Sequence, residues 1–190
     1  MFACSTTRLI LRDFVEDDWQ AIYALSQAPA VTCYQSWLRL ADPIEAQQWV
    51  QRAIHHNQLQ PREVYNLAVV EREYQAVIGW LGWGRPSDRM RGDYDFGYAL
   101  LPGVWGRGYM TEALQAAIDY MFEPLEARLV YGECASRNRA SARVMEKCGL
   151  TLVAQWDERD PTTGAGETHQ RYAIGVGEWR QRRSASGPRS

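Results

Sequence analysis

The chain has 190 residues, of which 46% are apolar and 23% are charged, so disorder, collagen and coiled coil are excluded over its whole length. The formal net charge is −2, which argues against a general nucleic-acid binder because such proteins are strongly basic. Residues 179–190 contain four arginines and no acid, and without these four charges the rest of the chain carries −6. We expect one domain over residues 1–178 and a mobile Arg-rich tail over residues 179–190.

The N-terminal segment and the cysteines indicate a cytoplasmic protein with reduced thiols. The first residues lack the basic start and apolar core of a signal peptide. No apolar run approaches the ~20 residues that a transmembrane helix needs. The four cysteines contain no CxxC pair, and the three histidines supply no metal-ligand spacing with them. We therefore expect no membrane segment and no bound metal.

The first third of the chain predicts one strand followed by two helices. Residues 8–12 are typical of a strand, and residues 16–26 place apolar side chains at helical spacing. An irregular aromatic stretch follows over residues 31–40. Asp42-Pro43 then has the form of a helix start, because proline is tolerated in a first turn.

The middle of the chain is rich in predicted strands. Residues 64–70 and 77–83 flank a short polar run, which predicts a hairpin. In residues 94–100 large apolar side chains alternate with small or acidic ones, which is typical of a strand. The clearest helix follows Gly108. Its apolar stripe keeps i, i+3, i+4 spacing through Met110, Ala113, Leu114, Ala117, Ile118, Met121 and Phe122.

The last third predicts a strand, a short helix and two closing strands. The first strand covers residues 129–134 and the helix covers residues 140–148. The closing strands are expected at residues 151–156 and 170–174, with a turn at residues 160–164 between them. The resulting order, β-α-α-β-β-β-α-β-α-β-β, predicts an α/β (α+β) fold with one mixed sheet and helices against it.

Gly106, Arg107 and Gly108 stand between a predicted strand and a predicted helix, where an anion can bind. Glycines let the backbone approach a ligand closely. The first amides of a helix lack internal partners and carry the positive end of its dipole. Phosphate or pyrophosphate suits such a place, and Arg107 could add a charge-assisted hydrogen bond. The same pattern also fits a plain strand-to-helix turn, so the motif alone leaves both interpretations open.

Two ordered segments carry a family resemblance, and they read Gly97-Tyr98-Ala99-Leu100 … Trp105-Gly106-Arg107-Gly108-Tyr109-Met110-Thr111-Glu112-Ala113 and Glu133-Cys134-Ala135-Ser136-Arg137-Asn138-Arg139-Ala140-Ser141-Ala142-Arg143-Val144-Met145-Glu146-Lys147-Cys148-Gly149-Leu150. They resemble the GCN5-related N-acetyltransferase (GNAT) superfamily, and more narrowly the RimJ/RimL-type ribosomal-protein N-terminal acetyltransferases. The resemblance extends over residues 6–178. It implies the GNAT fold, with a mixed and mostly antiparallel sheet of about seven strands flanked by helices.

The resemblance also implies acetyl-CoA as the co-substrate and a set of residues that would bind it. The amides that would hold the pyrophosphate are those of Gly106, Arg107, Gly108, Tyr109 and Met110. Leu100 and Leu101 would pair with the pantetheine arm. Asn138 would bond the pantetheine or order the space between neighbouring strands, and Arg143 would reach the adenosine.

Acetyl transfer to an amine needs a base for the amine and an acid for the leaving sulfur. Glu133 is the first candidate base, because the resemblance places a base there and a Glu on an apolar strand face is costly without a role or a partner. A salt-bridged Glu remains the alternative. Asp95 is a second candidate for attracting or deprotonating the amine. In many members of the family a Tyr acts as the general acid at the position where this chain has Met145. Methionine cannot donate a proton, so Ser141 or water would protonate the leaving sulfur.

Aromatic residues are candidates for the walls of the acceptor site. The resemblance implies this role for the segment that holds Tyr34 and Trp37, and Trp80 and Trp83 are expected to join them. Trp19 and Trp49 lie on apolar helical stripes and are expected in the core instead.

The leading hypothesis is an N-acetyltransferase that acts by direct attack in a ternary complex. The amine acceptor is expected to be a peptide or protein N-terminus, with a small amine such as a polyamine, an antibiotic or an amino-acid-like compound as the alternative. A non-catalytic acyl-CoA-binding protein is the rival from another class. Contact of the Arg-rich tail with RNA is a third interpretation, and a homodimer is left open.

Overall fold

The structure is a computed structural model that describes residues 2–86, 92–159 and 166–186 of the chain. The chain forms two compact units. Unit 1 comprises Met1–Gly84 and Gly97–Ala116, and unit 2 comprises Arg85–Phe96 and Ala117–Ser190. Strand β5 (Asp93–Leu100) and helix α4 (Tyr109–Phe122) each contribute to both units.

The eight described strands have the hydrogen-bonded order β1-β2-β3-β4-β5-β6-β8-β7. Most described pairs are antiparallel, and β5 with β6 is a parallel pair. This confirms the predicted mixed, mostly antiparallel sheet. The described chain has one strand more than expected, because β1 (Ala3–Ser5) pairs with β2 ahead of the predicted first strand.

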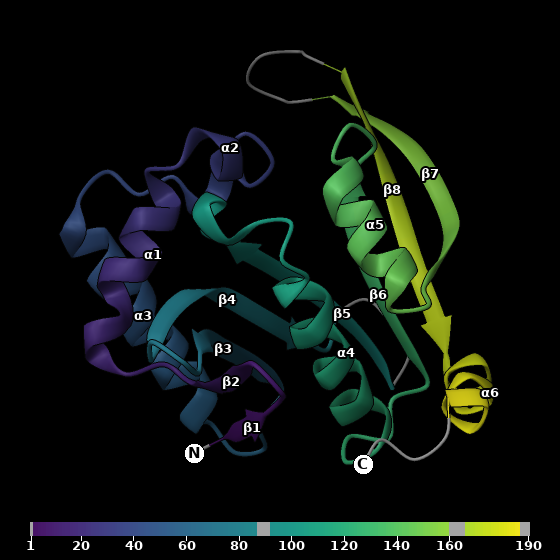
Figure 1. Ribbon diagram of the computed structural model, residues 1–190. Helices are drawn as coiled ribbons and strands as arrows, with labels where there is room; N and C mark the ends of the chain where they lie inside the picture. Colours follow the sequence, from purple (N-terminus) through teal and green to yellow (C-terminus); the bar gives the residue numbers. More distant parts are fainter. Residues whose placement is uncertain (1, 87–91, 160–165, 187–190) are drawn as a thin grey trace. The chain divides into compact units, whose positions relative to one another are not determined.

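Unit 1 begins with a meander of four antiparallel strands. The predicted hairpin is confirmed, with Leu67 opposite Leu81 and a register irregularity at Val69/Val70. Most large apolar side chains of β2, β3 and β4 are buried, and helices α1 and α3 pack against β4 and β3 (Figure 1). The remaining strands of the meander are β2 (Leu9–Asp13), β3 (Val64–Glu71) and β4 (Ala76–Gly84).

The helices of unit 1 pack against β3 and β4. Helix α3 (Pro43–Gln58) begins as predicted, because the Asp42 carboxylate accepts the Glu45 amide at 2.9 Å and Pro43 occupies the first turn. Helix α1 (Trp19–Ser26) follows a short 3-10 turn, η1 (Glu16–Asp18). The aromatic stretch contains α2 (Pro29–Thr32) and η2 (Ser36–Leu38). The core between helices and strands consists of Phe14, Ile22, Leu25, Val31, Leu38, Val50, Ala53, Ala68, Val70, Trp80 and Ala99.

Helix α4 is the predicted central helix. It follows the 3-10 turn η3 (Pro102–Val104) and the two glycines 106 and 108. Its whole predicted stripe is buried, and Pro124 follows two residues after its end.

Unit 2 is built on β6 (Leu129–Ala135), which runs parallel to the first half of β5 and antiparallel to β8 (Gly166–Gly175). Strand β7 (Thr151–Arg159) pairs with β8 on its other side. Helix α5 (Arg139–Lys147) packs against β6 and β8. Cys134 and Cys148 are buried free thiols. The turn predicted at residues 160–164 lies outside the described residues.

The Arg-rich segment predicted as a mobile tail is instead helical as far as Ser186, in α6 (Val176–Ser186). Trp179 explains the difference. Its side chain is buried, it stacks on Phe122 at 5.0 Å and its indole N–H donates to Asp119 at 2.8 Å. Composition alone does not reveal this anchor, because the surrounding residues have the polar character of a disordered end.

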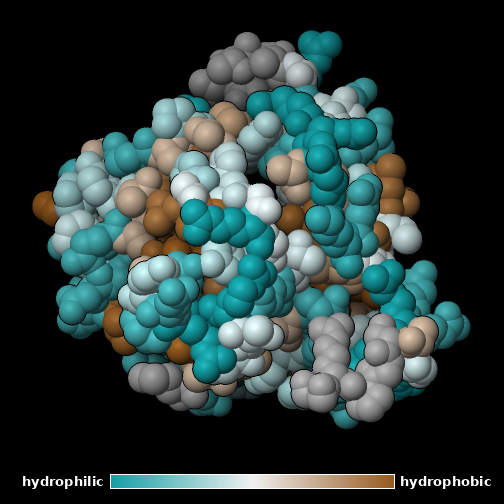
Figure 2. Space-filling view, viewed as in Figure 1, coloured by the Kyte–Doolittle hydropathy of each residue, from teal (hydrophilic) through white to brown (hydrophobic). Residues whose placement is uncertain are grey.

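Within the described residues, no helix is long and apolar enough to cross a membrane. The space-filling view shows hydrophilic and hydrophobic residues interspersed over the face it draws (Figure 2). Scattered apolar residues of this kind are normal on a protein surface.

Candidate active site

The glycine turn of unit 1 presents backbone amides at the start of α4. Gly106 and Gly108 have φ values of +76° and +79°, in the left-handed region that favours glycine. A Cβ at Gly106 would meet nothing within 4 Å, so the backbone conformation, and not crowding, calls for glycine there. The Glu112 amide donates to the Gly108 carbonyl at 3.1 Å. The amides of Tyr109 and Met110 therefore precede the first internal bond of the helix.

This turn is exposed and can offer backbone amides to an anion. Residues 106–108 are exposed, and the space beside Gly106 is open. The positive end of the α4 dipole faces the same turn. The five amides predicted to bind acetyl-CoA are thus consecutive at one helix start, and their contact with the co-substrate stays a prediction.

Leu100 and Leu101 are already bonded within unit 1. The Leu101 amide donates to the Ile78 carbonyl at 2.9 Å, and the Leu100 carbonyl accepts the Trp105 indole N–H at 2.7 Å. A pantetheine arm that pairs with this strand end would therefore have to bond to the Leu100 amide or to the second lone pair of the Leu100 carbonyl. Sequence reasoning missed Trp105 as a contact of this strand end.

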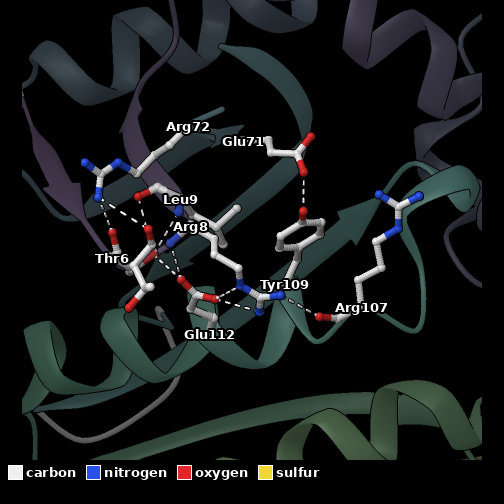
Figure 3. A network of polar contacts seen from close by, with 9 residues as sticks. Thr6, Arg8, Leu9, Glu71, Arg72, Arg107, Tyr109 and Glu112 are labelled. Carbon is white, nitrogen blue, oxygen red and sulfur yellow. Dashed lines mark hydrogen bonds and ion pairs between the residues drawn. The ribbon is translucent and has the colours of Figure 1, made fainter. Parts of the chain in front are cut away.

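A polar network holds the turn from the side of β2 (Figure 3). Glu112 accepts hydrogen bonds from the Thr6 hydroxyl at 2.6 Å and from the Arg8 amide at 2.8 Å. The Arg8 guanidinium contacts the same carboxylate and the Arg107 carbonyl. Tyr109 donates to Glu71, a bond that raises the pKa of the phenol. Glu112 thus has a structural role in unit 1.

Two predicted carboxylates line one pocket in unit 2. Asp95 lies opposite Tyr131 in the parallel pair β5–β6, and Glu133 is two residues further along β6, so the three side chains share a face. The pocket measures about 310 Å³ and is lined by Pro86, Asp95, Phe96, Tyr131, Gly132, Glu133 and Arg171.

Glu133 is ion-paired with Arg171, the partner directly opposite in the antiparallel pair β6–β8. Arg171 Nε donates to Glu133 Oε1 at 2.7 Å, and Nη2 donates to the same oxygen. The guanidinium also lies over the Tyr131 ring, 4.7 Å from its centre. Both bonds from Arg171 go to Oε1, so this ion pair does not use Oε2. Sequence reasoning missed Arg171, because only the strand register brings it to Glu133.

Asn138 and Ser141 form the start of α5. Asn138 Oδ1 accepts the Ser141 amide at 3.1 Å, so the side chain caps the helix. Burial raises the pKa of the Cys134 thiol, and a hydrogen bond with Ser141 opposes that shift. Met145 is buried, and its sulfur would lie 3.1 Å from a Cβ at Gly132. Arg143 is exposed on α5. The predicted roles of Asn138, Ser141 and Arg143 stay predictions.

The predicted aromatic walls separate into two groups. Trp37 and Trp80 lie 5.5 Å apart in an edge-on pair, and Trp49 joins them at 6.0 Å from Trp80. Trp83 is instead buried and stacks on Tyr65 at 4.9 Å. The first group lines a pocket of about 190 Å³ in unit 1, with the lining Trp37, Trp49, Arg52, Ala53, His56, Asn66 and Trp80.

This pocket brings together only some of the aromatics predicted as acceptor-site walls, and the role of Tyr34, Trp37, Trp80 and Trp83 in acceptor binding stays a prediction. Trp49, expected only in the core, is also a pocket wall. Trp83 and Tyr34 are not among the residues that line it. Trp83 is on the other side of β4 from Trp80, because residues three apart in a strand point to opposite faces. Tyr34 is 39% exposed.

The fold and the glycine turn define an acyl-CoA-dependent acetyltransferase of the GNAT type. The chain matches the family described as "Acetyltransferase (GNAT) domain" over residues 8–151, and it belongs to that family. N-acetyl transfer from acetyl-CoA is the activity that this membership supports. The family match confirms the GNAT fold. The described residues contain no group of three or more His, Cys, Asp and Glu that could hold a metal ion.

Individual relatives extend over nearly the whole chain. The uncharacterized N-acetyltransferase YnaD of Bacillus subtilis is 25% identical over 175 residues, which are 92% of this chain and 98% of that protein. RimL, a ribosomal L7/L12 α-N-protein acetyltransferase solved with coenzyme A, has a TM-score of 0.77 at 20% identity, and the match covers 90% of this chain and 95% of RimL. Spermidine N-acetyltransferase from Vibrio cholerae, solved with CoA and spermine, has a TM-score of 0.77 at 19% identity. The match covers 92% of this chain and 99% of that protein. The two solved structures share the fold.

Proposed function

We propose that the chain transfers an acetyl group from acetyl-CoA to the α-amine of a peptide or protein N-terminus, in the manner of the RimJ/RimL type. The observation that carries this proposal is the carboxylate-lined pocket of unit 2, which places Asp95 and Glu133 on one face. An amine is mostly protonated at neutral pH, so carboxylates both attract it and accept its proton.

The reaction is a direct attack in a ternary complex. Glu133 Oε2 takes the proton that the amine loses, while Arg171 holds Oε1 and fixes the carboxylate plane. The neutral amine nitrogen then bonds to the acetyl carbon and loses its second proton to water, and the carbon–sulfur bond of the thioester breaks. The sulfur leaves as a thiolate and is protonated by Ser141 or water. The Ser141 hydroxyl already contacts the Cys134 thiol, which favours water.

A small cationic amine is the second candidate acceptor, and the same pocket supports it. One guanidinium against two carboxylates leaves the pocket net negative. A spermidine acetyltransferase shares the fold, as does RimL, so the fold does not choose between the two acceptor classes.

Three further expectations bear on this proposal. A cytoplasmic location fits the free cysteines and stays a prediction, as does a homodimer. RNA binding by the Arg-rich segment is disfavoured, because Arg183 pairs with Glu123 within unit 2 and the Arg182 guanidinium lies against Gly149.

The test is release of free thiol from acetyl-CoA with two acceptor panels, peptides with free N-termini and polyamines. We expect turnover with peptides, and a fall of about a hundredfold in kcat for Glu133→Gln with unchanged affinity for CoA. Glu167→Gln is the matched control, because Glu167 on β8 also pairs with an arginine, Arg137, but lies outside the pocket.

Three outcomes would change the proposal. Turnover with polyamines alone would replace the peptide acceptor by a small amine. Tight binding of acetyl-CoA without turnover on either panel would favour the non-catalytic acyl-CoA-binding protein. Equal losses in Glu133→Gln and Glu167→Gln would remove Glu133 as the base.

A further inference from the structure

We propose that Arg8 is a positioning residue for acetyl-CoA, because it holds the glycine turn, residues 106–108, in the shape that binds the pyrophosphate. The inference rests on the proposed function, which assigns the turn to acetyl-CoA. It adds Arg8, which directly precedes β2 and which the family resemblance did not assign to this site.

The Arg8 side chain contacts three residues of the turn and of α4 (Figure 3). Its Nε and Nη2 atoms each lie 2.7 Å from Glu112 Oε2, and Nη1 donates to the Arg107 carbonyl at 2.9 Å. The guanidinium carbon is 4.6 Å from the centre of the Tyr109 ring. A Cβ at Gly108 would lie 3.6 Å from Nη2. One planar group therefore contacts residues 107, 109 and 112 and lies close to Gly108.

The bond to the Arg107 carbonyl fixes the direction of the next amide. A trans peptide is planar, and its C=O and N–H point in opposite directions. Because the Arg107 carbonyl points to Arg8, the Gly108 N–H points away from Arg8. This amide is one of the five that the proposed function gives to the pyrophosphate.

Glu112 anchors Arg8 in turn. Its carboxylate accepts the Thr6 hydroxyl and the Arg8 amide as well as the guanidinium. The side chain of Glu112 is 18% exposed, whereas that of Arg8 is 45% exposed. Arg8 is thus held by hydrogen bonds at its backbone amide and at its guanidinium. The planar, forked guanidinium binds a carboxylate and a carbonyl at the same time, which a lysine ammonium in its place would not reproduce.

The discriminating variant is Arg8→Lys, which keeps the charge and loses the fork. Arg12→Lys is the matched control, because Arg12, four residues further along in β2, also binds a carboxylate and a carbonyl, those of Asp18 and Asp13. None of these partners belongs to the turn. Glu112→Gln is a second variant, whose amide oxygen still accepts from Thr6.

Two measurements separate positioning from a general loss of structure. The first is the dissociation constant of CoA by calorimetry. The second is kcat/KM with S-acetylpantetheine, which lacks the pyrophosphate, with the acceptor that the panels identify. For Arg8→Lys we expect CoA binding to weaken about tenfold, the size of one charge-assisted hydrogen bond, with S-acetylpantetheine turnover within about twofold of the unaltered chain. Glu112→Gln should show the same selective loss, and Arg12→Lys should show neither.

The inference fails if Arg8→Lys and Glu112→Gln bind CoA as tightly as the unaltered chain. It also fails if they lose S-acetylpantetheine turnover as much as CoA binding, or if Arg12→Lys weakens CoA equally. Absence of CoA binding by the unaltered chain would overturn the proposed function itself, and the assignment of Arg8 with it.

Discussion

In Glu112, a single residue, the effect of hydrogen bonds on the pKa outweighs the effect of burial. Burial of its side chain would raise the pKa, but hydrogen bonds from Thr6 and Arg8 and the charge of Arg8 lower it below its ordinary value of 4.5. A carboxylate with a lowered pKa in the folded protein stabilises the fold above its ordinary pKa. That stabilisation is lost as the pH falls through the folded value.

We therefore expect a pH-dependent stability difference between the unaltered chain and Glu112→Gln. Near pH 7 the unaltered chain should be more stable by about 1 kcal/mol. The difference should shrink as the pH falls below the ordinary pKa of 4.5, where the unfolded chain takes up the proton, and should be lost once the pH passes the lowered pKa of the folded protein. Urea unfolding between about pH 3 and pH 7 measures it. Glu63→Gln, at an exposed position, is the control, and a difference for Glu112→Gln that stays constant with pH would contradict the explanation.

The tryptophans show what a single residue's position in the sequence does and does not reveal. Trp80 and Trp83 were both predicted as acceptor-site walls, yet their separation of three places them on opposite faces of a strand. That signal was available in the sequence. The role of Trp49 was not, because a helical stripe does not show which of its residues reaches the edge of the core and lines a pocket.

Among the elements, helix α6 is the one for which amino-acid composition gave a wrong prediction, a mobile tail. Its residues are mostly polar, and Trp179 is buried, stacks on Phe122 and donates a hydrogen bond to Asp119. A long polar stretch around one aromatic residue predicts disorder when it is read by composition. Contacts with residues sixty positions away reverse that prediction.

Trp179→Ala should test the docking of α6. Loss of the stacked ring and of the indole hydrogen bond should lower the free energy of unfolding by about 2–4 kcal/mol. Arg180→Ala on the exposed side of the same helix should change it by less than about 0.5 kcal/mol. Chemical denaturation of both variants decides the matter, and equal stability of Trp179→Ala and the unaltered chain would restore the description of this segment as a loose tail.

Elements with a strong local pattern were predicted well, and pairings between distant elements were not. The stripe of α4, the capped start of α3 and the alternation of β5 are local signals, and each element is present. The pair Glu133–Arg171 depends on the register of β6 against β8. Register is set by packing between segments 38 residues apart, which no local pattern encodes.

For the whole molecule, the two units divide the proposed tasks. Unit 1 contains the glycine turn, its Arg8–Glu112 support and the aromatic pocket. Unit 2 contains the carboxylate pocket and the capped helix α5. The charge of the chain adds a long-range property to both. A net charge of −2 attracts a cationic acceptor, and salt screens that attraction.

The acceptor's charge should therefore decide the salt dependence of turnover. Two peptides with the same first two residues, one with Lys and one with Glu at the third, isolate the effect of charge. Between about 20 and 300 mM salt we expect kcat/KM to fall about two- to threefold for the Lys peptide and to hold or rise for the Glu peptide, because screening removes attraction in one case and repulsion in the other. Glu133→Gln should weaken the salt dependence for the Lys peptide, since it removes one pocket charge. Identical salt profiles for the two peptides would show that acceptor charge plays no part, and the acidic pocket would then act on the amine only at contact distance.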